Sequence, residues 1–137
     1  MKRTVRTPVD PAYSLHDMNI DKICPEGDKL TLYTQSGIVR AGENSAQVDG
    51  FVEFFGVDMD LCCVTLFDAI GNVGAFSGER MRLADFLDRF PVFGFSVLDE
   101  LYGFRETRYQ GHLTAQGGLW ECILEVYHEG DMVIVEK

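Results

Sequence analysis

The sequence predicts an α+β protein built mainly from antiparallel β-sheet. A Thr-Leu-aromatic triplet at residues 31–33 is followed by Gly37 and a second short apolar run, and a similar pattern recurs at residues 65–67 with Gly71. A β-prone segment, a glycine turn and a returning segment are typical of a β-hairpin. The chain also has 10 Phe and 5 Tyr, whose rings pack well across neighbouring strands. We therefore expect a twisted sheet or a partly open barrel of about seven to nine strands.

Alternating or β-prone segments place these strands along the chain. The expected strands cover residues 17–24, 29–34, 38–41, 47–57, 61–67, 73–76, 104–114, 119–127 and 132–136. The segment 61–67 is almost continuously apolar, which predicts a central strand covered on both faces. In the segment 119–127, alternation assigns Trp120, Cys122, Leu124 and Val126 to the core face.

Two short helices are expected between the strands. Apolar residues at positions i, i+3, i+4 and i+7 from Leu83 form one stripe, and Pro91 ends it, which predicts a helix over residues 83–90. Ser96 is a suitable N-cap for a second helix over residues 97–102, and a glycine follows where a helix commonly ends. We expect both helices to cover a sheet face.

The length of the chain favours one domain over residues 10–137, preceded by a flexible N-terminal arm over residues 1–9. The formal net charge is −10, and three of the 12 basic residues lie in the first six positions. The rest of the chain is therefore strongly acidic and repels phosphate backbones. This charge argues against nucleic-acid binding.

The sequence also argues against membrane insertion and secretion. No apolar run approaches the roughly 18 residues of a membrane helix, and the basic N-terminus is followed by two prolines instead of an apolar stretch. The cysteines Cys24, Cys62, Cys63 and Cys122 form no C-x-x-C pair. We interpret them as buried free thiols in the reducing cytoplasm, and we expect no zinc site, disulfide framework or cofactor.

One candidate metal site is the tight group His128, Glu129 and Asp131. An imidazole and two carboxylates within four residues are ligands that divalent metals accept. A solvated hairpin turn around Gly130 explains the same residues, and it is the favoured interpretation because further ligands are not evident.

A second candidate is a partner-binding surface on the strand expected over residues 104–114. Alternation places Arg108 and His112 on one face, where cationic groups suit a carboxylate. The simpler interpretation, and the favoured one, is cross-strand pairing with Glu121 and Glu125.

A third candidate is the adjacent aromatic pair Phe54 and Phe55. Neighbouring residues of a strand face opposite sides, so only one of the two belongs to a given face. If one side of the sheet is uncovered, the exposed ring marks a partner or dimer surface. If both sides are covered, neither ring is available.

No catalytic motif stands out, since the chain has neither a G-x-S-x-G elbow nor a phosphate-binding loop. We therefore expect a small, non-enzymatic accessory domain that binds a protein partner or forms a homodimer. Two alternatives remain open: a metal-dependent hydrolase centred on residues 128–131, and an acidic decoy or inhibitor that occupies a basic cleft.

Overall fold

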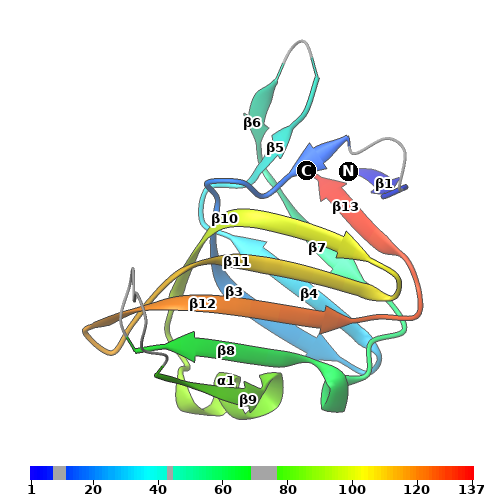
Figure 1. Ribbon diagram of the computed structural model, residues 1–137. Coiled ribbons are helices and arrows are strands. Elements are labelled where there is room, and N and C mark those ends of the chain that lie inside the picture. Colours follow the sequence, from blue (N-terminus) through cyan, green and yellow to red (C-terminus); the bar gives the residue numbers. More distant parts are fainter. Residues whose placement is uncertain (8–11, 43–44, 69–76) are drawn as a thin grey trace.

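The computed structural model describes residues 1–7, 12–42, 45–68 and 77–137. A ten-stranded sheet has the order β1-β13-β7-β4-β3-β10-β11-β12-β8-β9, and its neighbouring strands are antiparallel (Figure 1). A small second sheet has the order β2-β5-β6. The strands are β1 Lys2–Val5, β2 Tyr13–Ser14, β3 Asn19–Glu26, β4 Lys29–Thr34, β5 Ile38–Arg40, β6 Ala46–Val48, β7 Gly50–Phe54, β8 Cys63–Phe67, β9 Gly78–Arg82, β10 Gly94–Gly103, β11 Glu106–Ala115, β12 Gly118–Tyr127 and β13 Met132–Glu136. The expected antiparallel α+β architecture is confirmed.

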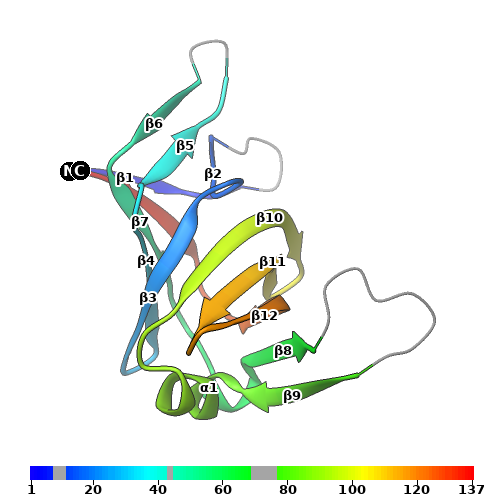
Figure 2. The ribbon, with the colours of Figure 1, turned by 90° about the vertical axis from the view of Figure 1, so that its left-hand side faces the viewer.

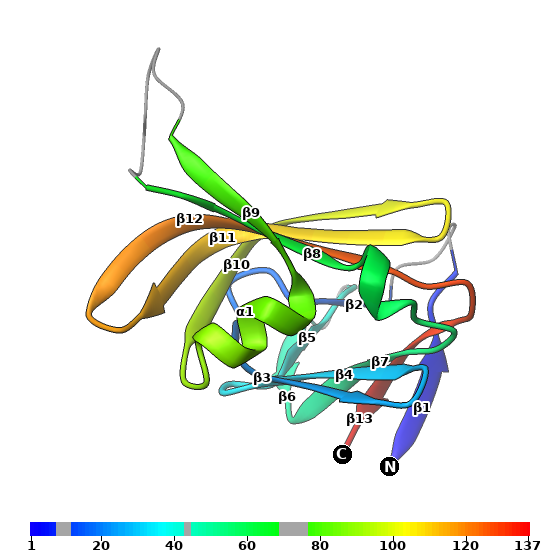
Figure 3. The ribbon, with the colours of Figure 1, turned by 90° about the horizontal axis from the view of Figure 1, so that it is seen from below.

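The sheet is bent so that two layers face each other. Figure 3 shows β10, β11, β12 and β8 in one layer and β3, β4, β7 and β13 in the other. Strands β1 and β9 lie at opposite edges of the strand order and the sheet is open. The ten strands of this sheet exceed the seven to nine expected from the sequence. One reason is that the single strand expected over residues 47–57 is divided between β6 and β7, which belong to different sheets.

The helix α1 (Leu83–Arg89) covers one end of the core between the layers, and the small sheet lies at the other end (Figure 2). Leu83 and Phe86 are buried, and the Phe86 ring lies 5.2 Å from that of Phe90 and 5.3 Å from that of Phe93. This helix confirms the expectation for residues 83–90. Among the described residues, no helix has the length and apolar character needed to span a membrane.

The second expected helix, over residues 97–102, is wrong. These residues belong to β10, which pairs with β11 from Gly94↔Thr114 to Gly103↔Glu106. A backbone that forms ladder hydrogen bonds with a neighbouring strand cannot also form the i to i−4 bonds of a helix.

Two further expectations are corrected near the ends of elements. Residues 2–5 do not form a flexible arm, because β1 pairs with β13 in antiparallel register. Strand β8 begins at Cys63 rather than residue 61, since Met59–Leu61 form a 3-10 turn, and β8 is fully buried on alternate residues only. The remainder of the expected arm at residues 8–9, and the strand and turn expected over residues 69–76, lie outside the described residues.

The core lies between the two layers and follows strand alternation. In β12, Cys122, Leu124 and Val126 are buried, as expected, and Trp120 is half-buried against the core. In β11 the inward residues include Tyr109 and Leu113. The sheet pairing between β3 and β10 is limited to Phe95↔Ile20 and Ser96↔Asn19. Beyond this short contact the two layers separate, and the candidate site lies there.

Candidate functional site

A β-bulge in β10 builds this site. Val97 pairs with Gly111 and Asp99 pairs with Gln110, so Leu98 is an extra residue in the ladder. Because side chains alternate between the faces of a strand, one extra residue reverses which of them point inward. Phe95 and Val97 are buried before the bulge, whereas Glu100 and Tyr102 take the partly buried positions after it.

Gly111 is the residue of β11 that accommodates the bulge. A Cβ atom at this position would lie 1.8 Å from the carbonyl oxygen of Ser96 and 3.1 Å from the backbone nitrogen of Leu98. Any side chain would therefore force the two strands apart. The bulge and the inward positions of Glu100 and Tyr102 depend on this glycine.

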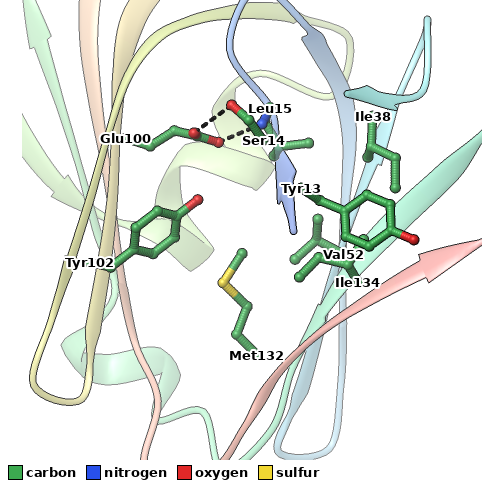
Figure 4. A pocket seen from close by; sticks show the side chains of 9 residues that line it. All are labelled: Tyr13, Ser14, Leu15, Ile38, Val52, Glu100, Tyr102, Met132 and Ile134. Atoms are coloured by element: carbon green, nitrogen blue, oxygen red, sulfur yellow. Dashed lines mark hydrogen bonds between the residues drawn. The ribbon is translucent and has the colours of Figure 1, made fainter. Parts of the chain in front are cut away.

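The inward side chains line a pocket between β10, β2 and the opposite layer (Figure 4). Its walls are mostly apolar, and the space between them has room for about one water molecule. The lining residues are Tyr13, Ser14, Leu15, Ile38, Val52, Glu100, Tyr102, Met132 and Ile134. We call this space the inner pocket.

A wider, shallower depression of about 360 Å³ lies beside the inner pocket. The two spaces share Tyr13, Ser14, Glu100 and Tyr102, and the depression is completed by Arg6, His16, Ala41, Leu98 and Asp99. We call the inner pocket and the depression together the cleft. It combines an apolar interior with a polar, charged rim, which is the usual composition of a binding site.

Glu100 holds β2 against β10 at the cleft. Its carboxylate accepts a hydrogen bond of 2.7 Å from the Ser14 hydroxyl and one of 2.5 Å from the backbone N–H of Leu15 (Figure 4). The backbone N–H of Asp17 also donates to the carbonyl of Val97 at 2.8 Å. These contacts fix the segment that forms one wall of the cleft.

A second carboxylate, Glu136, holds β2 from the other side. The Tyr13 hydroxyl donates to Glu136 at 2.7 Å, and Arg40 forms an ion pair with the same carboxylate. The Tyr13 hydrogen bond, followed by Arg40, lowers the pKa of Glu136. Strand β2 is thereby attached to both layers, so the cleft wall is fixed in place.

The rim of the cleft contains a cation and a phenol, and a second phenol is buried behind them. The Cζ atom of Arg6 lies 3.4 Å from the centre of the Tyr102 ring. Burial, followed by the charge of Glu100, raises the pKa of Tyr102, and burial raises the pKa of Tyr109 behind it. Both phenols are therefore neutral at ordinary pH. Within the described part of the chain, the buried Tyr109 hydroxyl has no hydrogen-bond partner.

Ser14, His16 and Asp17 resemble the residue types of a hydrolytic triad, but their geometry differs. The Ser14 hydroxyl donates to Glu100 and accepts from the backbone N–H of His16, at 2.9 Å. The imidazole instead lies 3.1 Å from the Asp17 carboxylate, and both side chains are exposed. An activated serine needs its hydroxyl hydrogen-bonded to the base. This arrangement instead orients β2.

The candidate metal residues are engaged in local contacts. Nδ1 of His128 lies 3.0 Å from the Gly130 carbonyl, and Nε2 lies 2.9 Å from the Thr107 hydroxyl. A carbonyl oxygen only accepts hydrogen bonds, so Nδ1 of His128 carries the proton. Nε2 therefore accepts the hydrogen bond that the Thr107 hydroxyl donates. Glu129 accepts from the Tyr127 hydroxyl at 3.2 Å. Within the described residues, which include Asp131, no group of three or more His, Cys, Asp or Glu side chains is placed to hold a metal ion.

Arg108 and His112 lie on the outer face of β11, away from the cleft, and Arg108 is paired with carboxylates there. Arg108 lies 2.6 Å from Glu106 and 3.8 Å from Glu125, and His112 is opposite Glu121. Glu125 also pairs with Arg80 at 2.9 Å. The Arg108 guanidinium therefore already has carboxylate partners, and a role of Arg108 and His112 in binding a partner stays a prediction.

The aromatic pair is divided by strand alternation, as expected. Phe54 is completely buried, and its ring lies 4.9 Å from that of His128. It therefore cannot form a partner surface in this fold, and that assignment is corrected. Phe55 is half-buried, and its role in binding a partner stays a prediction.

The residues of the cleft were not predicted from the sequence; they include Arg6, Ser14, Glu100 and Tyr102. They come from segments far apart in the chain, and the bulge that turns two of them inward has only one local signal. That signal is Gly111 inside an otherwise alternating strand, since an isolated glycine in a strand often marks a bulge.

No protein-family model matches the chain, and no curated protein or solved structure matches it. The cleft geometry is therefore the basis for a functional proposal.

Proposed function

We propose that the protein is a non-enzymatic binding domain that holds a segment of a partner polypeptide in the cleft between β2 and β10. One observation carries this proposal: the bulge in β10 turns Glu100 and Tyr102 inward and builds a cleft from side chains that simple alternation would place outside. Bulges are enriched next to functional sites because they redirect side chains in this way.

The open shape of the cleft favours a polypeptide over an enclosed cofactor. The inner pocket has room for about one water molecule, far less than typical ligand sites of about 300–1,000 Å³. A partner segment would therefore lie in the wider depression of about 360 Å³, with an apolar side chain packed over the mouth of the inner pocket. A buried anchor residue with a polar rim is the usual source of affinity at protein interfaces.

Leu98 adds an apolar contact at the mouth of the cleft. It is 38% exposed although it is a large hydrophobic residue, and it lines the depression.

The cytoplasm is the proposed location, on the strength of the cysteine spacing. The alternative of a metal-dependent hydrolase has no supporting observation, since both His128 nitrogens are engaged. The acidic-decoy alternative also has none, because the ion-paired carboxylates lie on both layers.

The test is a selection of peptides from a random display library against the full chain. We expect the selected peptides to share one apolar anchor residue. Leu98→Asp, which places a charge at the mouth of the cleft, is expected to weaken their binding at least about tenfold.

The matched control is Leu101→Asp. Leu101 is 63% exposed on the same strand but pairs with Arg108 on the outer face. Its substitution is expected to leave peptide affinity within about twofold of the unmodified protein. Failure to obtain a common anchor residue, or equal losses for the two variants, would contradict the proposed function.

A further inference from the structure

One edge of β10 is unpaired beyond the bulge. Along its other edge, the strand pairs with β11 up to its last residue, Gly103. On the unpaired side, the last backbone hydrogen bonds are made by Val97, whose N–H donates to Met18 at 2.9 Å and whose carbonyl accepts from Asp17 at 2.8 Å. Between Leu98 and Gly103, the described residues provide no further backbone partner on this side, which lies at the upper edge of its layer in Figure 1. We call the unpaired side of residues 98–103 the free edge.

Glu100 and Tyr102 present their backbone groups along the free edge. The side chains of a strand alternate between its faces, and the N–H and C=O groups alternate between its edges with the same period. Val97 has a buried, inward side chain and backbone groups that point away from β11. The other inward residues of this strand therefore direct their backbone to the same side. After the bulge these are Glu100 and Tyr102, whose N–H and C=O groups stand at the spacing of a β-ladder.

The free edge lacks the residues that discourage strand pairing. Natural sheets protect their open edges with charged side chains, above all Lys, and with Pro. The two terminal strands follow this rule, since β1 has Lys2 and Arg3, and β9 has Arg80 and Arg82. Residues 98–103 contain no Lys, Arg or Pro. The free edge is therefore better suited than either terminal strand to accept a further strand.

The depression gives a segment of chain access to the free edge. It lies along β10, and its volume of about 360 Å³ falls in the usual range of ligand sites, about 300–1,000 Å³. Leu98, Glu100 and Tyr102 line it from β10, and Ser14 and His16 line it from the segment around β2. The inner pocket therefore does not need to admit a side chain.

Asp99 gives the free edge a negative charge. Its side chain is exposed, and it lies where the depression meets the outer face of the sheet. It forms no ion pair with a described residue, and Arg108 on the neighbouring strand is already paired with Glu106 and Glu125. A strand added along the free edge would place a side chain beside Asp99, where cross-strand pairing favours a basic residue.

We infer that the partner segment binds in an extended conformation, as an additional strand along the free edge of β10. Its backbone exchanges hydrogen bonds with Glu100 and Tyr102, its inward side chains are apolar, and a basic side chain lies beside Asp99. The inference rests on the proposed function and states the chemistry of the partner. The alternating donors and acceptors of a strand edge are matched by another strand, whose main chain supplies affinity and whose side chains supply specificity.

The test is a backbone-methylation scan of a selected peptide against the unmodified protein. Each version of the peptide carries a methyl group on one backbone nitrogen, which removes one N–H donor. A strand with a single neighbour directs every second N–H to that neighbour and the others to solvent. We expect the affinity to fall at least about tenfold at every second nitrogen, and by less than about threefold at the nitrogens between them.

NMR spectroscopy of the complex locates the added strand. Intermolecular NOEs are expected between the backbone protons of the peptide and those of Glu100 and Tyr102. The open edge of β9 is the matched control, and the backbone of Arg80 is expected to give no intermolecular NOE.

Asp99→Asn tests the position of the basic residue. The variant is expected to weaken binding of a peptide with Lys or Arg next to its apolar anchor by about twofold to fivefold, the usual range for an exposed charge pair. Asp88→Asn removes another exposed carboxylate, on α1 at the other end of the core, and is expected to leave the affinity unchanged. Equal affinities of the two variants would contradict a basic residue beside Asp99.

Methylation losses without a period of two, or backbone NOEs to other edges and none to Glu100 and Tyr102, would overturn the added strand. These failures are distinguishable from failure of the proposed function. Peptides whose binding is weakened by Leu98→Asp and not by Leu101→Asp would keep the binding cleft, even if methylation shows no alternation.

Discussion

Burial divides the four cysteines into two pairs with different chemistry. Cys62 and Cys122 are 0% and 2% exposed, whereas Cys24 and Cys63 are half-buried. Burial raises the pKa of the Cys62 thiol, and it raises that of Cys122 to about 12. Since the thiolate is the reactive form, both buried thiols should be inert in the folded protein.

Alkylation with iodoacetamide at pH 8 tests this division. At that pH a thiol with a pKa of about 12 is ionised in roughly one molecule in ten thousand. Peptide mass spectrometry is therefore expected to find Cys24 and Cys63 modified well before Cys62 and Cys122. In denaturant, all four should react at similar rates. Modification of Cys122 as fast as Cys24 in the native protein would contradict the burial described here.

Single residues were predicted from the sequence to the extent that strand alternation decides their environment. Alternation correctly separated Phe54 from Phe55, but it did not identify which of them faces the core. The expectation that all four cysteines are buried fails for Cys24 and Cys63. Burial of an outward residue depends on what covers that face, and this is a property of the tertiary structure.

The bulge in β10 is the element on which the cleft depends, and Gly111 is its most sensitive position. Gly111→Ala places a Cβ atom 1.8 Å from the Ser96 carbonyl oxygen. The oxygen is a backbone atom and the Cβ is bonded directly to the backbone, so neither can move away by a side-chain rotation. We expect the free energy of unfolding to fall by about 3 kcal/mol, because neither strand can yield without breaking ladder hydrogen bonds. Chemical denaturation measures this change.

Gly103→Ala provides the control within the same hairpin. Its added Cβ would meet the Glu106 carbonyl oxygen at 3.8 Å, an ordinary contact. A change below about 0.5 kcal/mol is expected for this exposed position. Equal stability of the two variants would contradict the close approach of Gly111 to Ser96 at the bulge.

Strands with regular alternation or clear turns were predicted well, and the bulged strand was not. Strands β4 and β13 have the expected bounds, because glycine turns and apolar residues define both ends. In the segment 97–102, the extra residue interrupts the period of two. The resulting apolar spacing from Val97 to Tyr102 resembles a helical stripe. A local pattern cannot distinguish a phase shift in a strand from a helix.

At the scale of the whole molecule, the cleft is formed by contacts between distant parts of the chain. The hydrogen bonds of Glu100 to Ser14 and Leu15 join residues 86 and 85 positions apart. The bond between Tyr13 and Glu136 spans 123 positions. Nothing in the local sequence encodes these distances, so the antiparallel architecture could be predicted while the cleft could not. The predicted candidates instead lie on the outer face, in the last turn or, in the case of Phe54, in the core.

The most direct test of the binding cleft is a map of amide chemical shifts after a selected peptide is added to the isotope-labelled protein. We expect the largest changes on both walls of the cleft, at Ser14, Leu15, Leu98 and Tyr102. Gln110 and Ile123 on the outer face should change little. The largest changes at Gln110 and Ile123, with Ser14 and Tyr102 unaffected, would contradict the account.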